Sequence, residues 1–190
     1  MVWQNTVTGQ RLLGPGGISA GEFYRLVTSM FLHLGPLHLL TNMWALWVVG
    51  RTLEAVLGPI RFLVLYLVAG LGGSVAVYIF APYPGGAGAS GAIFGLFAAL
   101  FIILRRLKRD TSSLIPLLVI NLAISFLPGI SLTAHVGGLI TGAIVAFALA
   151  YSPVKSRRLY VGGTVAVLLA LMAVAVVVQT LNLRGFVPMS

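Results

Sequence analysis

Charged residues are scarce in this sequence, acidic residues are scarcer still, and cysteine is absent. Only 8% of the residues are charged and 59% are hydrophobic, whereas a soluble domain carries about 25% charged residues. A chain with so few charges cannot cover a folded surface with polar groups. The composition therefore excludes a soluble globular domain and predicts that lipid is the solvent. The absence of cysteine carries no information on the redox compartment.

Long apolar segments account for most of the chain. A helix that crosses a membrane needs about 20 apolar residues, and a helix satisfies all of its own backbone hydrogen-bonding groups in lipid. We therefore predict an all-α, polytopic membrane bundle of about six spans. The predicted spans are 37–57, 61–80, 88–104, 113–128, 132–151 and 159–181.

The first 36 residues are polar or interrupted by glycine and proline. Ser19 and Glu22 have the spacing of a capping box, in which two side chains satisfy N–H groups at a helix start. The short segment that follows, from Phe23 to Phe31, is amphipathic. We expect it to lie in the membrane interface or to enter the membrane partway as a re-entrant loop.

Basic residues are divided unequally between the two sets of predicted loops. Because cytoplasmic loops carry an excess of lysine and arginine, the richer set is predicted to be cytoplasmic, in an integral multi-pass protein of the cell membrane. The net charge of +9 is then a topology signal and not a nucleic-acid-binding face. The cytoplasmic set is Arg51, Arg61, Arg105, Arg106, Lys108, Arg109, Lys155, Arg157 and Arg158, against Arg11, Arg25 and Arg184 outside.

Ser90 lies in the sequence Gly88-Ala89-Ser90-Gly91, after a proline- and glycine-rich segment, 81–86, that cannot be helical. The third span therefore begins near Ser90, where backbone N–H groups are unpaired and the helix dipole is positive. Such a position suits a nucleophile whose attack creates an oxyanion. The structural alternative is a serine that bonds to its own helix or supports helix packing.

His135 is the candidate base that a serine nucleophile needs. It lies near the outer start of the fifth span, where the helix dipole disfavours imidazolium and keeps the ring neutral. Gly91 and Gly95 in the third span, and Gly138 and Gly142 in the fifth, have the spacing that lets membrane helices approach closely. Close approach would bring the histidine to the serine. The alternatives are an interfacial anchor for the histidine and generic packing for the glycines.

His38 and Asn42 form a second polar pair, four residues apart at the outer end of the first span. Both side chains can donate hydrogen bonds to a developing oxyanion. A polar pair inside a membrane usually has a partner or a function. The structural alternative is that the two residues cap the adjacent loop.

Other intramembrane chemistries lack the residues that they need. A zinc protease would show His-Glu-x-x-His, which is absent, and His33 and His38 are five apart and do not share a helix face. An aspartyl protease needs two aspartates, whereas Asp110 is alone and cytoplasmic. The other acids, Glu22 and Glu54, do not lie at the outer ends of the spans, which excludes a Ser-His-Asp triad. What remains is a Ser-His dyad that uses no metal or cofactor.

Taken together, these residues resemble the rhomboid family of intramembrane serine proteases. The resemblance covers roughly residues 21 to 150, in family order and at family spacing, and is very specific. The family usually has Trp-Arg where this chain has Tyr-Arg. The matching residues are Tyr24 with Arg25, His33, His38 with Asn42, Gly50 and Arg51 with Glu54, Gly88 with Ser90 and Gly91, and His135 with Gly138 and Gly142.

The resemblance implies an activity and a set of roles. Ser90 would be the nucleophile and His135 the general base. His38, Asn42 and the Ser90 backbone N–H would form the oxyanion site, with the glycines flanking the serine close to the substrate. Substrates would be membrane-spanning proteins, cut near the outer membrane face. Phe94 stands where many relatives have a tyrosine packed on the histidine ring; it can stack there but cannot donate a hydrogen bond.

Two further function classes are open. A non-catalytic rhomboid-like protein would bind or escort membrane clients, but such relatives typically lack the serine or the histidine, and this chain keeps both. A transporter or channel would usually carry polar residues through the depth of the membrane, whereas here they cluster at one end. The protease is therefore the leading hypothesis.

The resemblance also predicts a division of the chain. Residues 1–36 would form the interfacial or re-entrant loop, 37–151 the catalytic membrane core, and 152–190 an additional C-terminal transmembrane helix and tail. Family members have a span before the loop, and we expect this chain to lack it. We also expect the helix at 159–181 to lie outside the core, beside the histidine span, because the linker between them is short.

Overall fold

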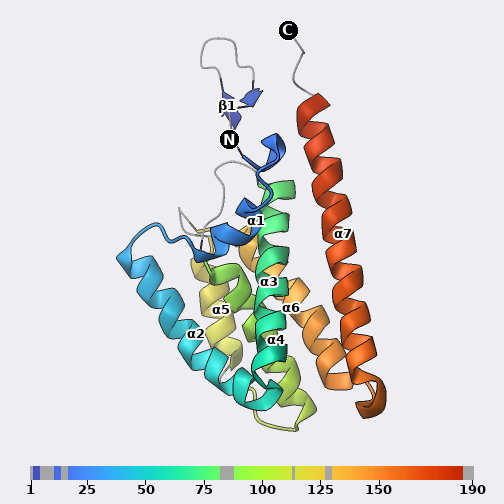
Figure 1. Cartoon of the computed structure of the whole chain (residues 1–190). Helices are drawn as coiled ribbons and strands as arrows, with labels where there is room; N and C mark the ends of the chain where they lie inside the picture. Colours follow the sequence, from blue (N-terminus) through green and yellow to red (C-terminus); the bar gives the residue numbers. More distant parts are fainter. Residues whose placement is uncertain are drawn as a thin grey trace.

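The computed structural model describes residues 2–4, 11–13, 17–81, 88–112, 114–126 and 130–185. These residues form a helical bundle with one small hairpin beside it (Figure 1). The longer helices lie where the sequence predicts spans, while residues 82–86 of the proline- and glycine-rich segment fall outside the described residues. In chain order the helices are η1 (Ile18–Ala20), α1 (Arg25–Thr28), η2 (Ser29–Phe31), α2 (Pro36–Leu57), α3 (Pro59–Phe80), α4 (Ser90–Arg106), α5 (Leu114–Ile124), α6 (Leu132–Tyr151), η3 (Val154–Ser156) and α7 (Arg157–Gly185).

A short hairpin is the departure from the predicted all-α chain. Strand β1 (Val2–Gln4) pairs antiparallel with β2 (Arg11–Leu13), with Trp3 opposite Leu12. Strands of three residues are too short for an alternating pattern to reveal them. The fold class is all-α as predicted, and the hairpin lies in the N-terminal segment outside the predicted spans.

Among the described residues, three helical stretches are long and apolar enough to cross a membrane by length and composition: Pro59–Phe80, Leu132–Tyr151 and Val154–Arg184. Helix α4 has 17 residues and α5 has 11, both shorter than the roughly 20 residues that a span needs. Helix α2 has 22 residues but includes Arg51 and Glu54. The count of six spans stays a prediction.

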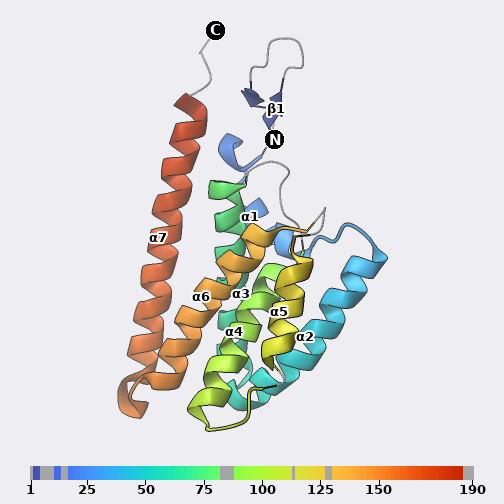
Figure 2. The ribbon, with the colours of Figure 1, turned by 180° about the vertical axis from the view of Figure 1, so that it is seen from behind.

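Helix α4 lies at the centre of the bundle, between α2 on one side and α7 on the other (Figures 1 and 2). The ten residues from Gly91 to Leu100 are all buried. Leu96 packs in one cluster with Leu53, Leu65 and Val145, each with no measurable exposure. The core thus joins α2, α3, α4 and α6.

Glycines bring the backbones of α3, α4 and α6 into direct contact. A Cβ atom added at Gly95 of α4 would lie 2.8 Å from the carbonyl oxygen of Gly138 on α6, and one at Gly142 would lie 2.6 Å from the carbonyl oxygen of Gly95. A Cβ at Gly73 of α3 would lie 2.7 Å from the carbonyl oxygen of Ala134. Any side chain at these positions would separate the helices. The predicted contact of the third and fifth spans is present, and α3 joins it.

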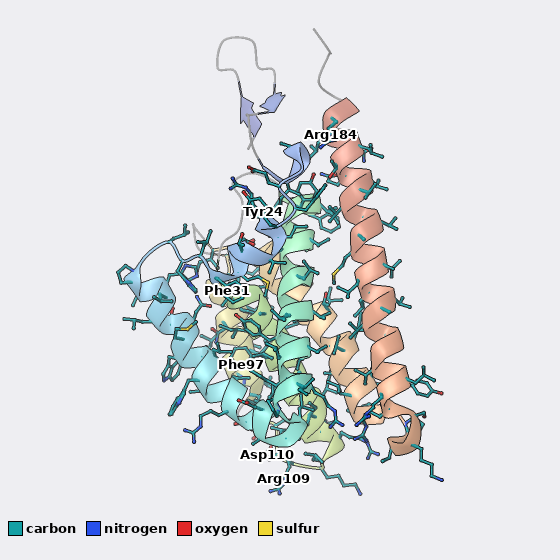
Figure 3. The ribbon with its side chains drawn as sticks, in the orientation of Figure 1. Tyr24, Phe31, Phe97, Arg109, Asp110 and Arg184 are labelled. Atoms are coloured by element: carbon teal, nitrogen blue, oxygen red, sulfur yellow. The ribbon has the colours of Figure 1, made fainter. Side chains whose placement is uncertain are left out.

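Helix α7 packs against α3 and α6 at the side of the bundle (Figures 1 and 2). This agrees with the expected position beside the histidine span. Its polar contacts are few. The Tyr78 hydroxyl lies 2.9 Å from Thr180 Oγ1. Arg184, near the end of α7 (Figure 3), donates from Nε to the Ser19 carbonyl at 2.7 Å. Most other α7 side chains are exposed and apolar, which suits a helix surrounded by lipid.

The predicted capping box does not form. Ser19 lies inside η1 and caps no helix, and α1 has no side-chain cap. Glu22 instead accepts hydrogen bonds from the Gly17 N–H at 2.5 Å and from Arg25 Nε at 2.6 Å. The chain turns at Gly21, whose φ of 103° favours glycine, so Ser19 and Glu22 do not share one helix start.

Candidate active site

Ser90 and His135 meet at one end of the bundle. Ser90 is the first residue of α4, and His135 lies in the first turn of α6. The distance between Ser90 Oγ and His135 Nε2 is 2.8 Å, within the range of a good hydrogen bond. The glycine spacing in the two helices predicts that they approach closely, and in the structure the two side chains are in contact.

A second serine contacts the other ring nitrogen. Ser125, in the turn after α5, places its Oγ 2.5 Å from His135 Nδ1. The same hydroxyl donates to the Asn121 carbonyl oxygen at 2.9 Å. Ser125 is 2% exposed and His135 is 5% exposed, so both nitrogens of the buried ring have protein partners.

The face of the imidazole is covered by Phe94, one helical turn after Ser90. The ring centroids of Phe94 and His135 are 4.0 Å apart and the ring planes differ by 12°. The stacked ring packs on one face of the imidazole and limits its tilt. Phe94 thus occupies the position predicted for it.

A cavity of about 630 Å³ contains Ser90 and His135. Its walls come from α2, α4, α5 and the start of α6, and most of its lining is apolar. A mostly apolar cavity with a few convergent polar groups is the usual form of a binding site. The polar residues that line it are His38, Thr41, Asn42, Ser90, Asn121, Ser131 and His135.

His38 and Asn42 line the same cavity from α2. Asn42 is buried and its side-chain amide donates to the His38 carbonyl oxygen at 2.8 Å, which leaves one N–H of that amide for another acceptor. Gly88, two residues before Ser90, lies close to His38: a Cβ atom added at Gly88 would lie 2.9 Å from His38 Nε2. Gly88 has a φ of 116° and donates its N–H to the Ser29 carbonyl at 2.9 Å.

His33 lies beside His38 although the two residues do not share a helix face. The two ring centroids are 5.2 Å apart in an edge-to-face arrangement. His33 precedes α2 and is not on a helix, so the two histidines share no helix face, as predicted. Its Nε2 is buried and has no hydrogen-bond partner among the described residues.

The remaining predicted supporting residues lie away from the cavity lining. Arg25 pairs with Glu22 and lies over the Tyr24 ring. Arg51 lies over the Trp47 ring at 5.2 Å from its centroid and is not paired with Glu54. Exposed ion pairs contribute little, so an adjacent aromatic face competes with the carboxylate. Gly91, Gly138 and Gly142 all serve the helix contact, Gly91 facing the Ala134 carbonyl.

Sequence reasoning missed Ser125. It stands ten residues before His135, with a turn between them, so no helical spacing connects the two. The signal present in the sequence is a hydroxyl at the end of the apolar segment that contains Asn121. The Asn121 carbonyl accepts the Ser125 hydroxyl, and Asn121 also lines the cavity.

Comparison with known proteins supports these observations. A family model described as the rhomboid domain matches residues 20–152. Rhomboid protease GluP of Bacillus subtilis (strain 168) is 45% identical over 138 residues, which cover 70% of this chain and 27% of GluP. Putative rhomboid protease YdcA of the same organism is 37% identical over 154 residues, covering 77% of this chain and 75% of YdcA.

Relatives named as inactive also match. Inactive rhomboid protein 1 of Rattus norvegicus is 37% identical over 134 residues, which cover 67% of this chain and 16% of that protein. The chain thus spans about a quarter of the length of GluP and less of the inactive relative. The family model covers more than half of the chain, and the apolar helices are those of an integral membrane protein. The chain therefore belongs to the rhomboid family.

Proposed function

We propose that this protein is an intramembrane serine endopeptidase that cleaves membrane-spanning proteins near the outer membrane face. The observation that carries the proposal is the hydrogen bond of 2.8 Å between Ser90 Oγ and His135 Nε2, inside a largely apolar cavity. A serine hydroxyl becomes a competent nucleophile when a neighbouring base takes its proton.

The hydrogen bonds around His135 favour one tautomer. The Ser125 hydroxyl donates to the Asn121 carbonyl, so its oxygen is free to accept from His135 Nδ1–H. With the proton on Nδ1, Nε2 carries a lone pair and accepts the Ser90 O–H. Ser125 would therefore be a positioning residue, holding the ring in the protonation state that activates the nucleophile.

The reaction follows from these positions. Ser90 Oγ attacks the substrate carbonyl carbon while its proton moves to His135 Nε2, and His135 then gives that proton to the leaving amine as the peptide bond breaks. Water attacks the acyl-enzyme with the proton transfers repeated, which releases the acid and restores Ser90. No step uses a carboxylate, a metal or a cofactor.

The oxyanion would form beside the start of α4. There the first-turn N–H groups lack intrahelical acceptors and the dipole favours negative charge. His38 and the second N–H of Asn42 would supply further donors from α2. Removing one such donor typically costs about 10²–10³ in rate, so Asn42 would act on kcat more than on KM.

A non-catalytic client-binding protein is the alternative, because relatives named as inactive match this chain. The close Ser90–His135 contact favours the protease. The two functions are separated by purifying the full chain into vesicles with a single-span reporter protein. The protease cleaves the reporter and loses this activity in Ser90→Ala and in His135→Ala; a client-binding protein retains the reporter intact in all three forms.

A further inference from the structure

A second cavity lies at the end of the bundle opposite to Ser90 and His135. It has a volume of about 630 Å³ and lies between the starts of α3 and α7. Helix α3 runs from this end toward the Ser90 end, and α6 runs from His135 down to the short link that leads into α7 (Figures 1 and 2). The proposed protease chemistry does not use this cavity.

Three arginines line the cavity: Arg61 at the start of α3, and Arg157 and Arg158 at the start of α7. None of the three acidic residues of the chain lines it. Within the described part of the chain, the one ion pair joins Glu22 to Arg25, so these guanidinium groups have no carboxylate partner there. Positive charge is therefore concentrated at the cavity without compensation.

Arg157, which lines the cavity, has a buried donor without a partner among the described residues. The donor is the Nε–H group, whereas buried N–H groups in folded proteins are nearly always paired. Helices α3 and α7 both begin at this cavity, and helix N-termini present unpaired N–H groups and a positive dipole to an anion. A ligand with anionic oxygens would satisfy all of these donors.

The rest of the cavity wall is apolar. Val64 lines it from α3, and Val161 and Val165 line it from α7. Between them lies Gly162, where an added Cβ would meet no atom within 4 Å. A free inorganic anion would leave this apolar wall exposed to water. An amphiphile with an anionic head group and hydrocarbon chains would match both the arginines and the apolar wall.

We propose that this cavity binds one anionic phospholipid, with its phosphate between Arg61, Arg157 and Arg158 and an acyl chain along the apolar wall between α3 and α7. Basic cavities between membrane helices are suited to such head groups. The proposal does not depend on proteolysis. A general attraction of basic loops to anionic lipid would involve Lys155 and Arg109 equally, but these two residues do not line the cavity.

Native mass spectrometry of the full chain in detergent tests the proposal. The chain is titrated in separate arms with phosphatidylglycerol, phosphatidylcholine and inorganic phosphate. We expect one phosphatidylglycerol molecule to be retained per chain at concentrations where phosphatidylcholine is not. Equal retention of the two lipids would overturn the proposal, as would displacement of phosphatidylglycerol by inorganic phosphate, which would assign the site to the free ion.

Two pairs of variants separate the site from general charge. Arg157→Gln with Arg158→Gln should weaken phosphatidylglycerol binding roughly thirtyfold, while Lys155→Gln with Arg109→Gln, which removes the same charge, should leave it nearly unchanged. Equal losses in the two double variants would contradict a defined site.

The second pair of variants leaves the charge of the cavity unchanged. Gly162→Leu fills the cavity and should abolish retention, whereas Gly163→Leu, at a neighbouring glycine that also faces open space but does not line the cavity, should not. The unfolding temperature of each variant establishes that it is folded. Normal phosphatidylglycerol retention by a folded Gly162→Leu protein would overturn the proposal.

Discussion

Helices α4 and α7 are both apolar, yet they contact the rest of the molecule in opposite ways. Ten consecutive residues of α4 are buried, and glycines place its backbone against α3 and α6. In α7 only Val176 and Thr180 are buried among the described residues, and Gly162 and Gly163 face open space. An apolar sequence can therefore form either a central helix or a peripheral one.

The difference shows what positions a membrane active site. Lipid is as apolar as leucine, so burying apolar surface contributes little to helix association, and close packing decides instead. Ser90 and His135 are positioned by backbone contact between α4 and α6. Helix α7 packs one apolar side against the bundle at Val176 and adds a few polar contacts with α3 and the Ser19 turn. Changes in the first region should affect catalysis, and changes in the second should affect stability alone.

The largest effect is expected where the two central helices meet. Ser90→Ala and His135→Ala should each reduce cleavage of a single-span reporter by at least about 10³, and the double variant should be no worse than either single one, because members of a catalytic unit fail together. Initial rates in vesicles measure this. Additive losses in the double variant would show that the two residues do not act in one step.

Matched glycine substitutions compare the two regions directly. Gly142→Val should destabilise the protein by about 1–3 kcal/mol or more through overpacking and should lose activity, because a Cβ there meets the α4 backbone. Gly163→Val on α7 should change stability by no more than about 0.5 kcal/mol. Thermal unfolding and reporter cleavage check both. Equal tolerance at the two sites would refute backbone contact as the positioning device.

Removing the Ser125 hydroxyl should have an intermediate effect. Ser125→Ala leaves His135 Nδ1 without its partner and should lower kcat about tenfold while KM stays near its original value, since a group that acts through the base affects the chemical step. Ser125→Thr, which keeps a hydroxyl, should recover much of the rate. A change confined to KM would place Ser125 in substrate binding instead.

A polar contact of α7 provides the contrasting small effect. Thr180→Val removes the partner of the Tyr78 hydroxyl and should cost about 0.6 kcal/mol, the average for such bonds between membrane helices. The kcat of reporter cleavage should not change. A loss of kcat with an unchanged unfolding temperature would mean that α7 takes part in positioning the dyad.

The smallest effect is expected at Glu22, whose turn meets the end of α7 through Ser19. The Arg25 side chain, followed by the Gly17 N–H, lowers the pKa of the Glu22 carboxyl. Its contribution to stability is therefore present at neutral pH and is lost as the pH falls through the lowered value. Glu22→Gln should weaken this acid dependence of the unfolding temperature slightly and leave cleavage unchanged. Lost cleavage in a folded Glu22→Gln protein would bring a carboxylate into the mechanism.

Much of the site was predictable because its signals are local. The spacing of Gly91 with Gly95, and of Gly138 with Gly142, indicates two helices in contact, and Ser90 and His135 each lie near a helix start. Ser125 was not predictable, because it reaches His135 across a turn that has no regular period. The contact of Arg51 with the Trp47 ring was not predictable either, because spacing alone does not rank that aromatic face against the carboxylate of Glu54.

The positions of the long helices were also predictable from the sequence. Apolar length located α2 to α7 within a few residues, but the hairpin of β1 and β2 is too short to produce a pattern. The cavity between α3 and α7 was also not predictable, because it depends on how the two helices pack against each other. Sequence periodicity describes single elements and their contact faces, not the spaces left between them.

The most direct test of the account is the site of covalent modification by a fluorophosphonate, which reacts with an activated serine. The full chain in detergent is treated with the probe, digested and analysed by mass spectrometry. The account predicts one adduct, on Ser90, that disappears in Ser90→Ala and falls sharply in His135→Ala. An adduct on another serine, or labelling of folded protein that persists in Ser90→Ala, would contradict the Ser90–His135 dyad.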